Sequence, residues 1–518
     1  MLVLITPSSS SPGARAGLRE RLALAVLTLA VVLLAVDGTV LALAVPALTA
    51  DLAPTATQLL WIGDVYSFAL AGLLVTMGNL ADRIGRKRLL LIGAVGFGAA
   101  SVLAAFAPTA ETLILARVLL GISGATIMPS TLSIVRNLFT DPAQRTRAIA
   151  VWSAGATGGA AIGPLVGGAL LEHFPWGSVF LINVPVMVVL VVAGAFLIPE
   201  SRNPDAGPLD LWSAVLSMAG VVPIVYAVKA LASEGVTVPA AAAAALGVVS
   251  LVAFVRRQRR LAHPMIDVTL FRNPAFSGAV AANTLAIFAF IGTLFFFSQY
   301  LQLVRGLSPL QAGLVELPAT LASLVVILVV GIVVGRLGRG PSIAVGLAAA
   351  SIGMVLVAVA EGAPDLLWLI LALAVLSFGA TIAMTVSTDV IMSAVPRQRA
   401  GAASAVSETA YELGVALGIA LLGSLHTLVY RSALVIPPGT DGGTAAAARD
   451  SLAAARPSAE ADLLESAQHA FTTGMQVTSL LAAALIAIAS IVAWRLIPTG
   501  RDGTARDEAP VAADATTR

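Results

Sequence analysis

The feature that most constrains this chain is a long series of apolar runs. Among its 518 residues such runs recur about fourteen times, each near the roughly 20 residues that an α-helix needs to cross the hydrocarbon core of a membrane. We expect them at 22–46, 57–77, 89–107, 113–135, 148–170, 177–198, 209–231, 236–255, 276–303, 310–334, 341–360, 365–394, 403–430 and 474–497. Only 11% of the residues are charged, against about a quarter in a soluble domain. The chain is therefore predicted to be an all-α polytopic membrane protein.

The basic residues are distributed unevenly among the connecting segments. If the N-terminus faces the cytoplasm, the cytoplasmic segments hold 24 of the 30 Lys and Arg residues. The loops on the other side hold only Arg305, Arg431, Arg449 and Arg456. Because cytoplasmic loops are enriched in Lys and Arg, both termini are predicted to be cytoplasmic. The long segment 431–473 is then extracellular, with a short surface helix expected within 446–470.

Several classes of protein are excluded or disfavoured. The chain has no cysteine, so it has no disulfide, no thiolate metal site and no cysteine nucleophile. Its net charge of +2 and the lack of interleaved aromatic and basic residues argue against a nucleic-acid partner. The four histidines are scattered, and neither an HExxH motif nor a phosphate-loop lysine occurs. We therefore expect neither an enzyme nor an ATP-driven pump, and no metal or cofactor.

The sequence contains an internal repeat. Residues 78–88 read GNLADRIGRKR, and a degraded copy, GIVVGRLGR, occupies 331–339. When Gly85 is superposed on Gly338, Asp64 falls within one position of Glu316. The chain is therefore predicted to be duplicated, with six helices in each half and two additional helices between them.

Four segments carry a resemblance to a known family. They are 37–46 (DGTVLALAVP), 78–88, 117–124 (RVLLGISG) and 159–168 (GAAIGPLVGG). These segments resemble signatures of helix 1, the loop between helices 2 and 3, helix 4 and helix 5 in the major facilitator superfamily. The match is with the 14-helix drug:proton antiporters of the QacA and EmrB type, and it covers nearly the entire chain.

The resemblance implies a major facilitator fold of two six-helix bundles with two additional helices, 14 transmembrane helices in all. The implied divisions are a cytoplasmic tail at 1–20, a bundle at 21–199, two linker helices at 200–262, a second bundle at 263–498 that includes the extracellular loop 431–473, and a cytoplasmic tail at 499–518.

The resemblance also implies a function. It is proton-coupled multidrug efflux by alternating access in the bacterial inner membrane, driven by the proton gradient without a cofactor. The partners would be small-molecule drugs, mainly organic cations, together with protons and the lipid bilayer, with no nucleic acid and no obligatory protein partner. An alternative left open is an exporter of the same superfamily dedicated to one self-made antibiotic or to a lipid, because these motifs concern the transport cycle and not the cargo.

Several carboxylates lie inside the apolar runs. Each costs roughly 2.5–3.5 kcal/mol to insert at a helix centre and tends to persist only where it faces a cavity or a partner. Glu408 and Glu412 are one helical turn apart and share a face, so they cannot both ionise easily. We predict that the proton- and substrate-binding residues are Asp37, Asp64, Glu316, Glu408 and Glu412.

A second group of residues is predicted to act in gating and coupling. In the loop 78–88, the family resemblance implies that Asp82, with Arg83 and Arg86, pairs across the bundle in one state of the cycle and separates in the other. The alternative is that the basic residues of this loop only fix the membrane topology.

Arg117, Gly163 and Pro164 complete the gating group. Arg117 is implied to face inward and to bias the protonation of a nearby carboxylate, although an arginine near a helix end can also snorkel to the surface. Gly163 and Pro164 are expected to let their helix bend during closure, or simply to allow close packing. Asp389 and Lys229, which lie nearer the ends of their runs, are left outside the predicted site, and Lys229 is expected to snorkel.

Aromatic residues near these carboxylates form a further candidate group. They are Trp61, Tyr66, Phe68, Phe295, Phe296 and Tyr300, joined by Met384. Their π faces could line a cavity for an organic cation, but packing and lipid contact are the alternative for most of them.

Overall fold

The computed structural model describes residues 17–139, 141–202, 210–261, 264, 266, 268–394, 400–456 and 460–497. Within these ranges the chain is helical and contains no strand. Thirteen helices are long and apolar enough to cross a membrane, and α5, which is bent by 43° between Arg147–Ala160 and Ile162–His173, makes a fourteenth. The predicted polytopic fold is confirmed. Residues 1–16 and 498–518, which include most of the expected tails, lie outside the described residues.

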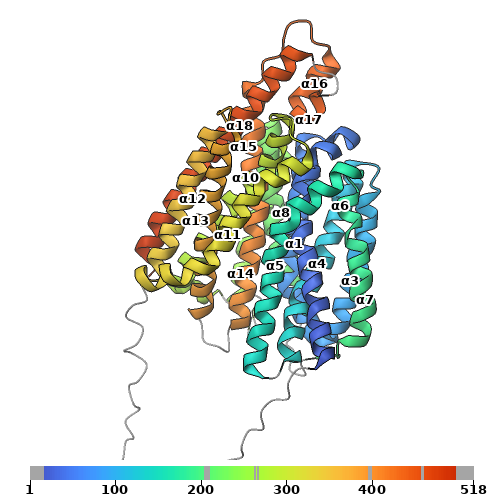
Figure 1. Ribbon diagram of the computed structural model, residues 1–518, viewed down its shortest axis with the longest axis vertical. Coiled ribbons are helices and arrows are strands. Elements are labelled where there is room, and N and C mark those ends of the chain that lie inside the picture. Colours follow the sequence, from blue (N-terminus) through green and yellow to red (C-terminus); the bar gives the residue numbers. More distant parts are fainter. Residues whose placement is uncertain are drawn as a thin grey trace, which may run out of the picture.

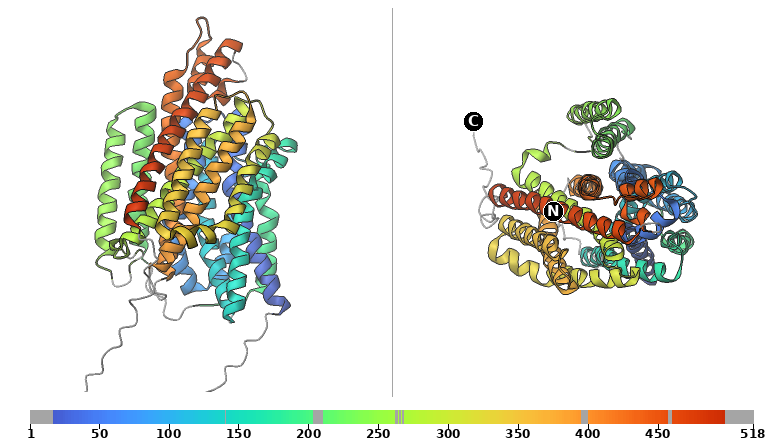
Figure 2. Two further views of the ribbon diagram at one scale, coloured as in Figure 1. Left: turned by 60° about the vertical axis from the view of Figure 1, so that its left-hand side comes forward. Right: turned by 90° about the horizontal axis from the view of Figure 1, so that it is seen from above.

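The helices form two bundles and a separate pair (Figures 1 and 2). The first bundle contains α1 (Leu18–Leu52), α2 (Ala56–Ile84), α3 (Arg86–Ala105), α4 (Ala110–Leu138), α5 (Pro142–His173), and the single span made by α6 (Ser178–Leu181) and α7 (Asn183–Leu197). The second contains α10 (Pro274–Leu303), α11 (Pro309–Leu337), α12 (Arg339–Ala360), α13 (Leu366–Ser393), α14 (Ala400–Leu417) with α15 (Gly423–Ala433), and α18 (Ala461–Leu496). A π-helical turn at Gly418–Leu422 joins α14 to α15, and a short 3-10 helix at Leu270–Arg272 precedes α10.

The predicted duplication extends to the local details of helix formation. Helices α2 and α11 both have 29 residues. Each begins with a capping box, formed by Thr55 with Gln58 and by Ser308 with Gln311, in which the hydroxyl and the amide satisfy free backbone groups of the first turn. Each ends at a glycine with a positive φ, +116° at Gly85 and +87° at Gly338. These are the positions that the sequence repeat superposes.

Close helix packing within each bundle depends on glycine. Helix α1 packs on α5, as α10 packs on α14 in the second bundle. A Cβ at Gly159 would lie 2.5 Å from the Val32 carbonyl oxygen, and one at Gly163 would overlap the Thr39 hydroxyl. The backbones of α1 and α5 therefore approach as only small residues allow, which supports the packing interpretation of Gly163.

The two bundles meet along two seams, α2 with α14 and α5 with α11. At the second seam, a Cβ on Gly313 would lie 2.5 Å from the Pro164 carbonyl oxygen. Beside the first, a Cβ on Gly63 would lie 3.1 Å from Ile419, which belongs to the π-helical turn that follows α14. Gly63 and Gly313 lie near the starts of α2 and α11, and α2 starts just after the end of α1 that packs on α17. Helices α16 and α17 lie at the opposite end of the bundle from the start of α1 (Figure 1).

The segment between α15 and α18 caps that end. It contains two short helices, α16 (Gly442–Asp450) and α17 (Leu452–Ala455), and α18 already begins at Ala461. The surface helix expected within 446–470 thus exists, but it starts earlier and is divided. The cap is tied to both bundles: Arg456 donates to the Gln302 carbonyl oxygen at 3.4 Å, and Gln302 donates to the Leu43 carbonyl oxygen at 3.0 Å.

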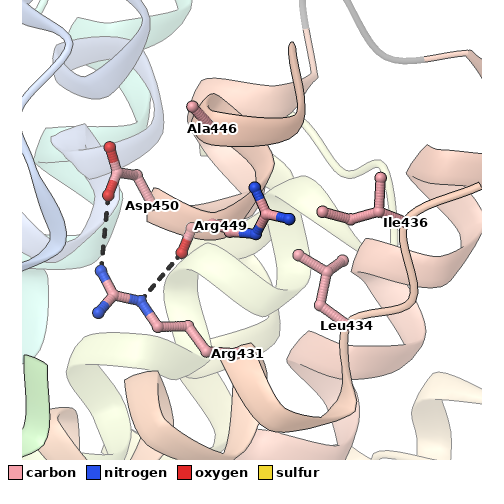
Figure 3. A pocket seen from close by; sticks show the side chains of 6 residues that line it. All are labelled: Arg431, Leu434, Ile436, Ala446, Arg449 and Asp450. Atoms are coloured by element: carbon pink, nitrogen blue, oxygen red, sulfur yellow. Dashed lines mark hydrogen bonds and ion pairs between the residues drawn. The ribbon is translucent and has the colours of Figure 1, made fainter. Parts of the chain in front are cut away.

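A pocket of about 550 Å³ lies beside this cap (Figure 3). Arg431 of α15 extends along it, donating to the Arg449 carbonyl oxygen at 3.1 Å and pairing with Asp450 at 3.5 Å. The Arg431 guanidinium therefore holds α16 to α15.

The remaining pair, α8 (Leu211–Glu234) and α9 (Val238–Gln258), stands at the edge of the molecule (Figure 2). It joins the rest through α8, which packs on α2 and α15. At its lower end Asp210 caps α8 through the Ser213 backbone and pairs with Arg257 of α9 at 2.8 Å. Burial by itself would raise the pKa of the Asp210 carboxyl, but the hydrogen bonds from Arg257 and Ser213 hold that pKa below its ordinary value.

The turn between α2 and α3 is held by a residue from the end of the first bundle. The backbone amides of Lys87 and Arg88 donate to the Glu200 carboxylate at 3.1 and 3.2 Å, which satisfies free donors at the start of α3. A Cβ on Gly85 would lie 2.6 Å from that carboxylate. Glycine is thus required at this position both for its φ and for the approach of Glu200.

We expect Gly85→Ala to destabilise the protein by about 1–3 kcal/mol, the usual range for a strained backbone conformation. Gly331→Ala is the matched control, because Gly331 lies within α11 and a Cβ there meets nothing within 4 Å. Thermal unfolding of the purified protein in detergent measures the difference. Equal midpoints for the two variants would contradict this account of the turn.

Candidate transport site

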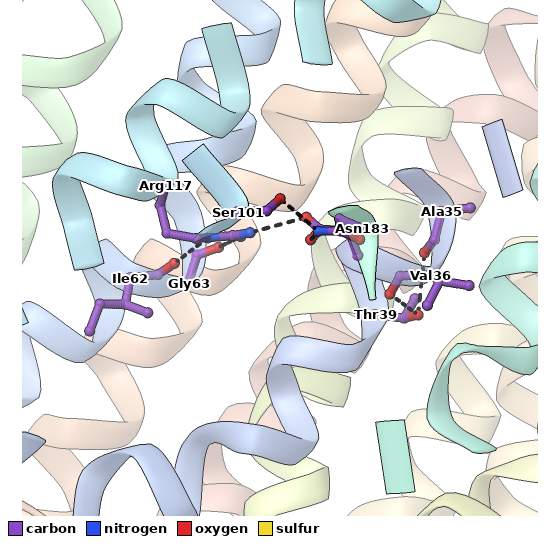
Figure 4. Close-up of polar contacts among 9 residues, drawn as sticks. Ala35, Val36, Thr39, Ile62, Gly63, Ser101, Arg117 and Asn183 are labelled. Atoms are coloured by element: carbon purple, nitrogen blue, oxygen red, sulfur yellow. Dashed lines mark hydrogen bonds and ion pairs between the residues drawn. The ribbon is translucent and has the colours of Figure 1, made fainter. Parts of the chain in front are cut away.

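A buried arginine is the centre of the candidate site (Figure 4). Arg117 of α4 is 2% exposed. Its guanidinium donates to the backbone oxygens of Ile62 at 3.1 Å and Gly63 at 3.5 Å, and it pairs with Asp37 at 3.4 Å. Arg117 therefore points into the bundle and does not snorkel. Its charge meets one carboxylate of α1 and two carbonyl dipoles of α2.

The other oxygen of Asp37 is also occupied. The Asn183 side chain at the start of α7 donates to it at 2.8 Å and to the Ser101 hydroxyl of α3 at 3.2 Å. All three side chains are buried. Four helices of the first bundle, α1, α3, α4 and α7, thus contribute to one hydrogen-bonded group around a single carboxylate.

The second bundle reaches this group through Glu412 of α14. The Tyr66 ring of α2 lies against the Arg117 guanidinium, 4.7 Å from the ring centroid. Glu412 is 7% exposed and is hydrogen-bonded to Ser67, the residue after Tyr66. The α2–α14 seam therefore brings an acid of the second half to the helix that Arg117 contacts.

Glu408 lies one turn before Glu412 on the same helix and is more exposed. The two carboxylates are one helical turn apart on α14. Of the pair, Glu412 is hydrogen-bonded to the first bundle, through Ser67.

Glu316 occupies a separate place. It lies one turn after Gly313 on α11, and Gly313 contacts the Pro164 backbone of α5. Its side chain is 6% exposed, and within the described part of the chain its Oε1 atom has no hydrogen-bond partner. The structure thus places Glu316 on the α5–α11 seam, away from the Arg117 group.

Asp64 has a partner that the sequence interpretation left out. The Lys229 ammonium of α8 lies 2.7 Å from its carboxylate, and the two side chains are 1% and 0% exposed. The same ammonium lies 3.7 Å from the centroid of the Trp61 ring. The expectation that Lys229 snorkels to the membrane surface is wrong, because a carboxylate within reach inside the protein binds its charge.

The predicted gating loop makes a local contact. Asp82 pairs with Arg86 one turn later at 2.8 Å, while Arg83 is exposed. In the second bundle the counterpart of Arg86, Arg339, pairs instead with Asp389 of α13 at 2.9 Å. Both loops thus bind an arginine to an acid at the same end of the molecule, although the acid comes from a different element.

Asn183, Ser101 and Lys229 are the site residues that sequence reasoning missed. Asn183 is the one amide in an otherwise apolar run, NVPVMVVLVVAGAFL, and a polar side chain in such a run was the available signal. Among the described residues, no three His, Asp or Glu side chains are grouped so that they could hold a metal ion.

Two helical bundles that bury charged side chains along their common seams define a polytopic membrane transporter. The chain belongs to the major facilitator superfamily, whose model matches residues 27–419. It is a transporter and not an enzyme, and a multi-pass protein of the bacterial inner membrane.

Named relatives agree with this assignment. The chain is 48% identical to the multidrug efflux pump LfrA of Mycolicibacterium smegmatis, over 94% of this chain and 97% of that protein. It is 37% identical to the methyl viologen resistance protein SmvA of Salmonella typhimurium, over 92% and 98%. It is 33% identical to the tetracenomycin C resistance and export protein of Streptomyces glaucescens, over 98% and 97%.

The fold also matches solved structures. A bacterial homologue of the human lysosomal transporter Spinster, in an inward-facing and occupied conformation, superposes with a TM-score of 0.64. That match covers 92% of this chain and 96% of the other at 16% identity, and it confirms the fold.

We expect the Asp37 group to behave as one unit. Asn183→Ala removes the donor to Asp37 and should destabilise the protein by about 1–3 kcal/mol, because a buried acceptor loses its hydrogen bond. Asp37→Asn and the double variant complete a thermodynamic cycle, for which a coupling of about 0.5–3 kcal/mol is expected between contacting residues. Thermal unfolding in detergent measures all four proteins. Strictly additive effects would show that Asn183 does not act through Asp37.

Proposed function

We propose that this transporter is a drug:proton antiporter that exports lipophilic organic cations, such as quaternary ammonium compounds and dyes, by alternating access and without a cofactor. One observation carries the proposal. Asp37 of the first half pairs with Arg117, and Glu412 of the second half is hydrogen-bonded to Ser67, next to the Tyr66 whose ring lies against Arg117.

Competition for these carboxylates provides the coupling. An acid at the seam can hold either a proton or a cationic cargo, and Arg117 supplies a fixed charge that each form must balance. When a proton binds, the cation loses its counter-charge and is released. One charge moving through 100 mV is worth about 2.3 kcal/mol. A monovalent cargo leaves against the same potential, so exchange of one proton for one such cation is electroneutral, and each further proton supports a cargo gradient of roughly fifty-fold.

The relatives support the proposed cargo class. Methyl viologen, to which SmvA by its name confers resistance, is an aromatic dication, and buried carboxylates with nearby aromatic rings suit such a compound. The tetracenomycin C exporter represents the alternative of one dedicated antibiotic. A screen of cargoes of different charge separates the two, because the dedicated exporter would respond to one compound only.

The arrangement of the seams supports assigning this structure to one conformational state of the transport cycle. The glycine contacts and the α16–α17 cap close one end of the bundle. With the termini on the cytoplasmic side, as the distribution of basic residues favours, the closed end is the extracellular one. The contacts at Gly313 and Gly63 would then have to separate when the cargo leaves.

Everted membrane vesicles provide the test of coupling. We expect wild-type protein to move ethidium in a manner abolished by collapse of the proton gradient, and Glu412→Gln to lower this movement at least tenfold, because a neutral amide can neither carry the proton nor attract the cation. Glu361→Gln is the matched control, since Glu361 is also a buried glutamate, at 2% exposed, but lies at the end of α12 and not on α2 or α14.

Ethidium movement that survives collapse of the gradient would exclude proton coupling. An equal loss in the Glu361→Gln protein would show that any buried glutamate is needed for folding, and would remove the special role of Glu412.

The orientation can be measured directly because the natural chain has no cysteine. Gly442→Cys places a thiol on the exposed cap, and Arg259→Cys places one at the exposed end of α9. A membrane-impermeant maleimide applied to intact cells should label the first and not the second. Labelling of Arg259→Cys alone would show that the orientation in the membrane is the reverse of the one proposed.

A further inference from the structure

Lys229 belongs to α8, one of the two helices that lie outside the two bundles. Phe68 of α2 packs with Val225 of α8 in a small apolar cluster that also includes Ala416 and Ala420. Val225 lies one turn before Lys229, and Phe68 one turn after Asp64. The ammonium is therefore directed at α2 by an interface that is otherwise apolar.

The place that the ammonium occupies has the chemistry of a cation-binding site. Trp61 and Asp64 are three residues apart on one face of α2. They present an indole face and a carboxylate to the same point, 3.7 Å and 2.7 Å from the lysine nitrogen. An aromatic face combined with a negative charge is the arrangement that proteins use to bind alkylammonium and quaternary ammonium groups.

Adhesion between the helices does not require this ion pair. A buried pair of charges is often no more stabilising than apolar residues of the same volume, because both charges lose their hydration. The α2–α8 interface already has the Phe68–Val225 contact and a close approach at Gly72, where a Cβ would lie 2.6 Å from Met218. A role in recognition explains the charges better than a role in adhesion.

We propose that Trp61 and Asp64 form a subsite for the positively charged group of an organic cation, and that Lys229 is its tethered, replaceable occupant. The lysine and a cationic ligand cannot occupy the subsite at the same time. Binding of a cation there displaces Lys229, while departure of the cation lets the lysine return and neutralise Asp64. The proposal rests on the proposed function only in taking the natural ligand to be an organic cation.

The flexible stem of a lysine suits this exchange. Its ammonium is a point charge on four rotatable carbons, so it can leave the subsite without unfolding α8. A larger cation can add contact with a second aromatic ring, because the Phe68 ring lies 6.5 Å from the Trp61 ring.

The first experiment replaces the tether by a free ligand. Lys229→Ala removes the side chain and leaves its space, and n-butylammonium reproduces the missing part. At pH 8, where this probe is a cation, we expect it to raise the unfolding temperature of purified Lys229→Ala protein, with an apparent affinity at least tenfold higher than for wild type. Neutral n-butanol should not raise the unfolding temperature, and the effect of n-butylammonium should vanish in Lys229→Ala/Asp64→Asn. Equal affinity of n-butylammonium for Lys229→Ala and for Lys229→Ala/Asp64→Asn would overturn the proposal.

The second experiment remains informative if Lys229→Ala folds poorly. Lys229→Met fills the space with a neutral chain, and we expect it to bind ethidium about tenfold more tightly than wild type by fluorescence titration, whereas Lys229→Arg keeps the wild-type affinity. Weaker or unchanged binding by Lys229→Met would contradict the proposal. If ethidium binds no variant while butylammonium still binds Lys229→Ala, the proposed cargo class fails and the subsite stands.

Discussion

The charge of Arg117 must be neutralised inside a bundle that excludes water, and the first half of the protein is arranged around that requirement. An isolated charge at this depth is expensive, so the guanidinium draws on Asp37, on two carbonyl oxygens of α2 and on the Tyr66 ring. Asn183 then donates to the other oxygen of Asp37 and to the Ser101 hydroxyl. Because α2 carries both the carbonyl oxygens and Asp64, the Arg117 group and the Asp64–Lys229 pair are neighbours on one helix.

The two halves share the features that shape their helices but differ in the surroundings of their charged residues. Caps, helix lengths and the glycines that end α2 and α11 correspond between the halves, because they satisfy backbone requirements that both halves share. The acids do not correspond in the same way. Asp64 is paired with a lysine, whereas its counterpart Glu316 lies on the other seam with an oxygen that has no partner among the described residues. One fold thus offers acids in different electrostatic surroundings.

Sequence reasoning was successful where a property belongs to one segment. Membrane spans follow from hydropathy, the repeat from superposed glycines, and the depth of Asp37 or Glu412 from its distance to the helix ends. It failed at Lys229, since a lysine near a helix end can reach water or a buried acid, and its position along the helix is the same in both cases. It also passed over Asn183, whose importance depends on which carboxylate stands opposite.

The amino-acid sequence was thus sufficient to establish a fourteen-helix membrane protein with two related halves and acids buried in both, because hydrophobic length, capping residues and glycine positions act locally. Which charges meet depends on the rotation of each helix about its axis and on its neighbours. Those are set by packing between segments far apart in the chain, such as Asp37 against Asn183 and Asp64 against Lys229. Only the assembled bundle brings these partners within hydrogen-bonding distance.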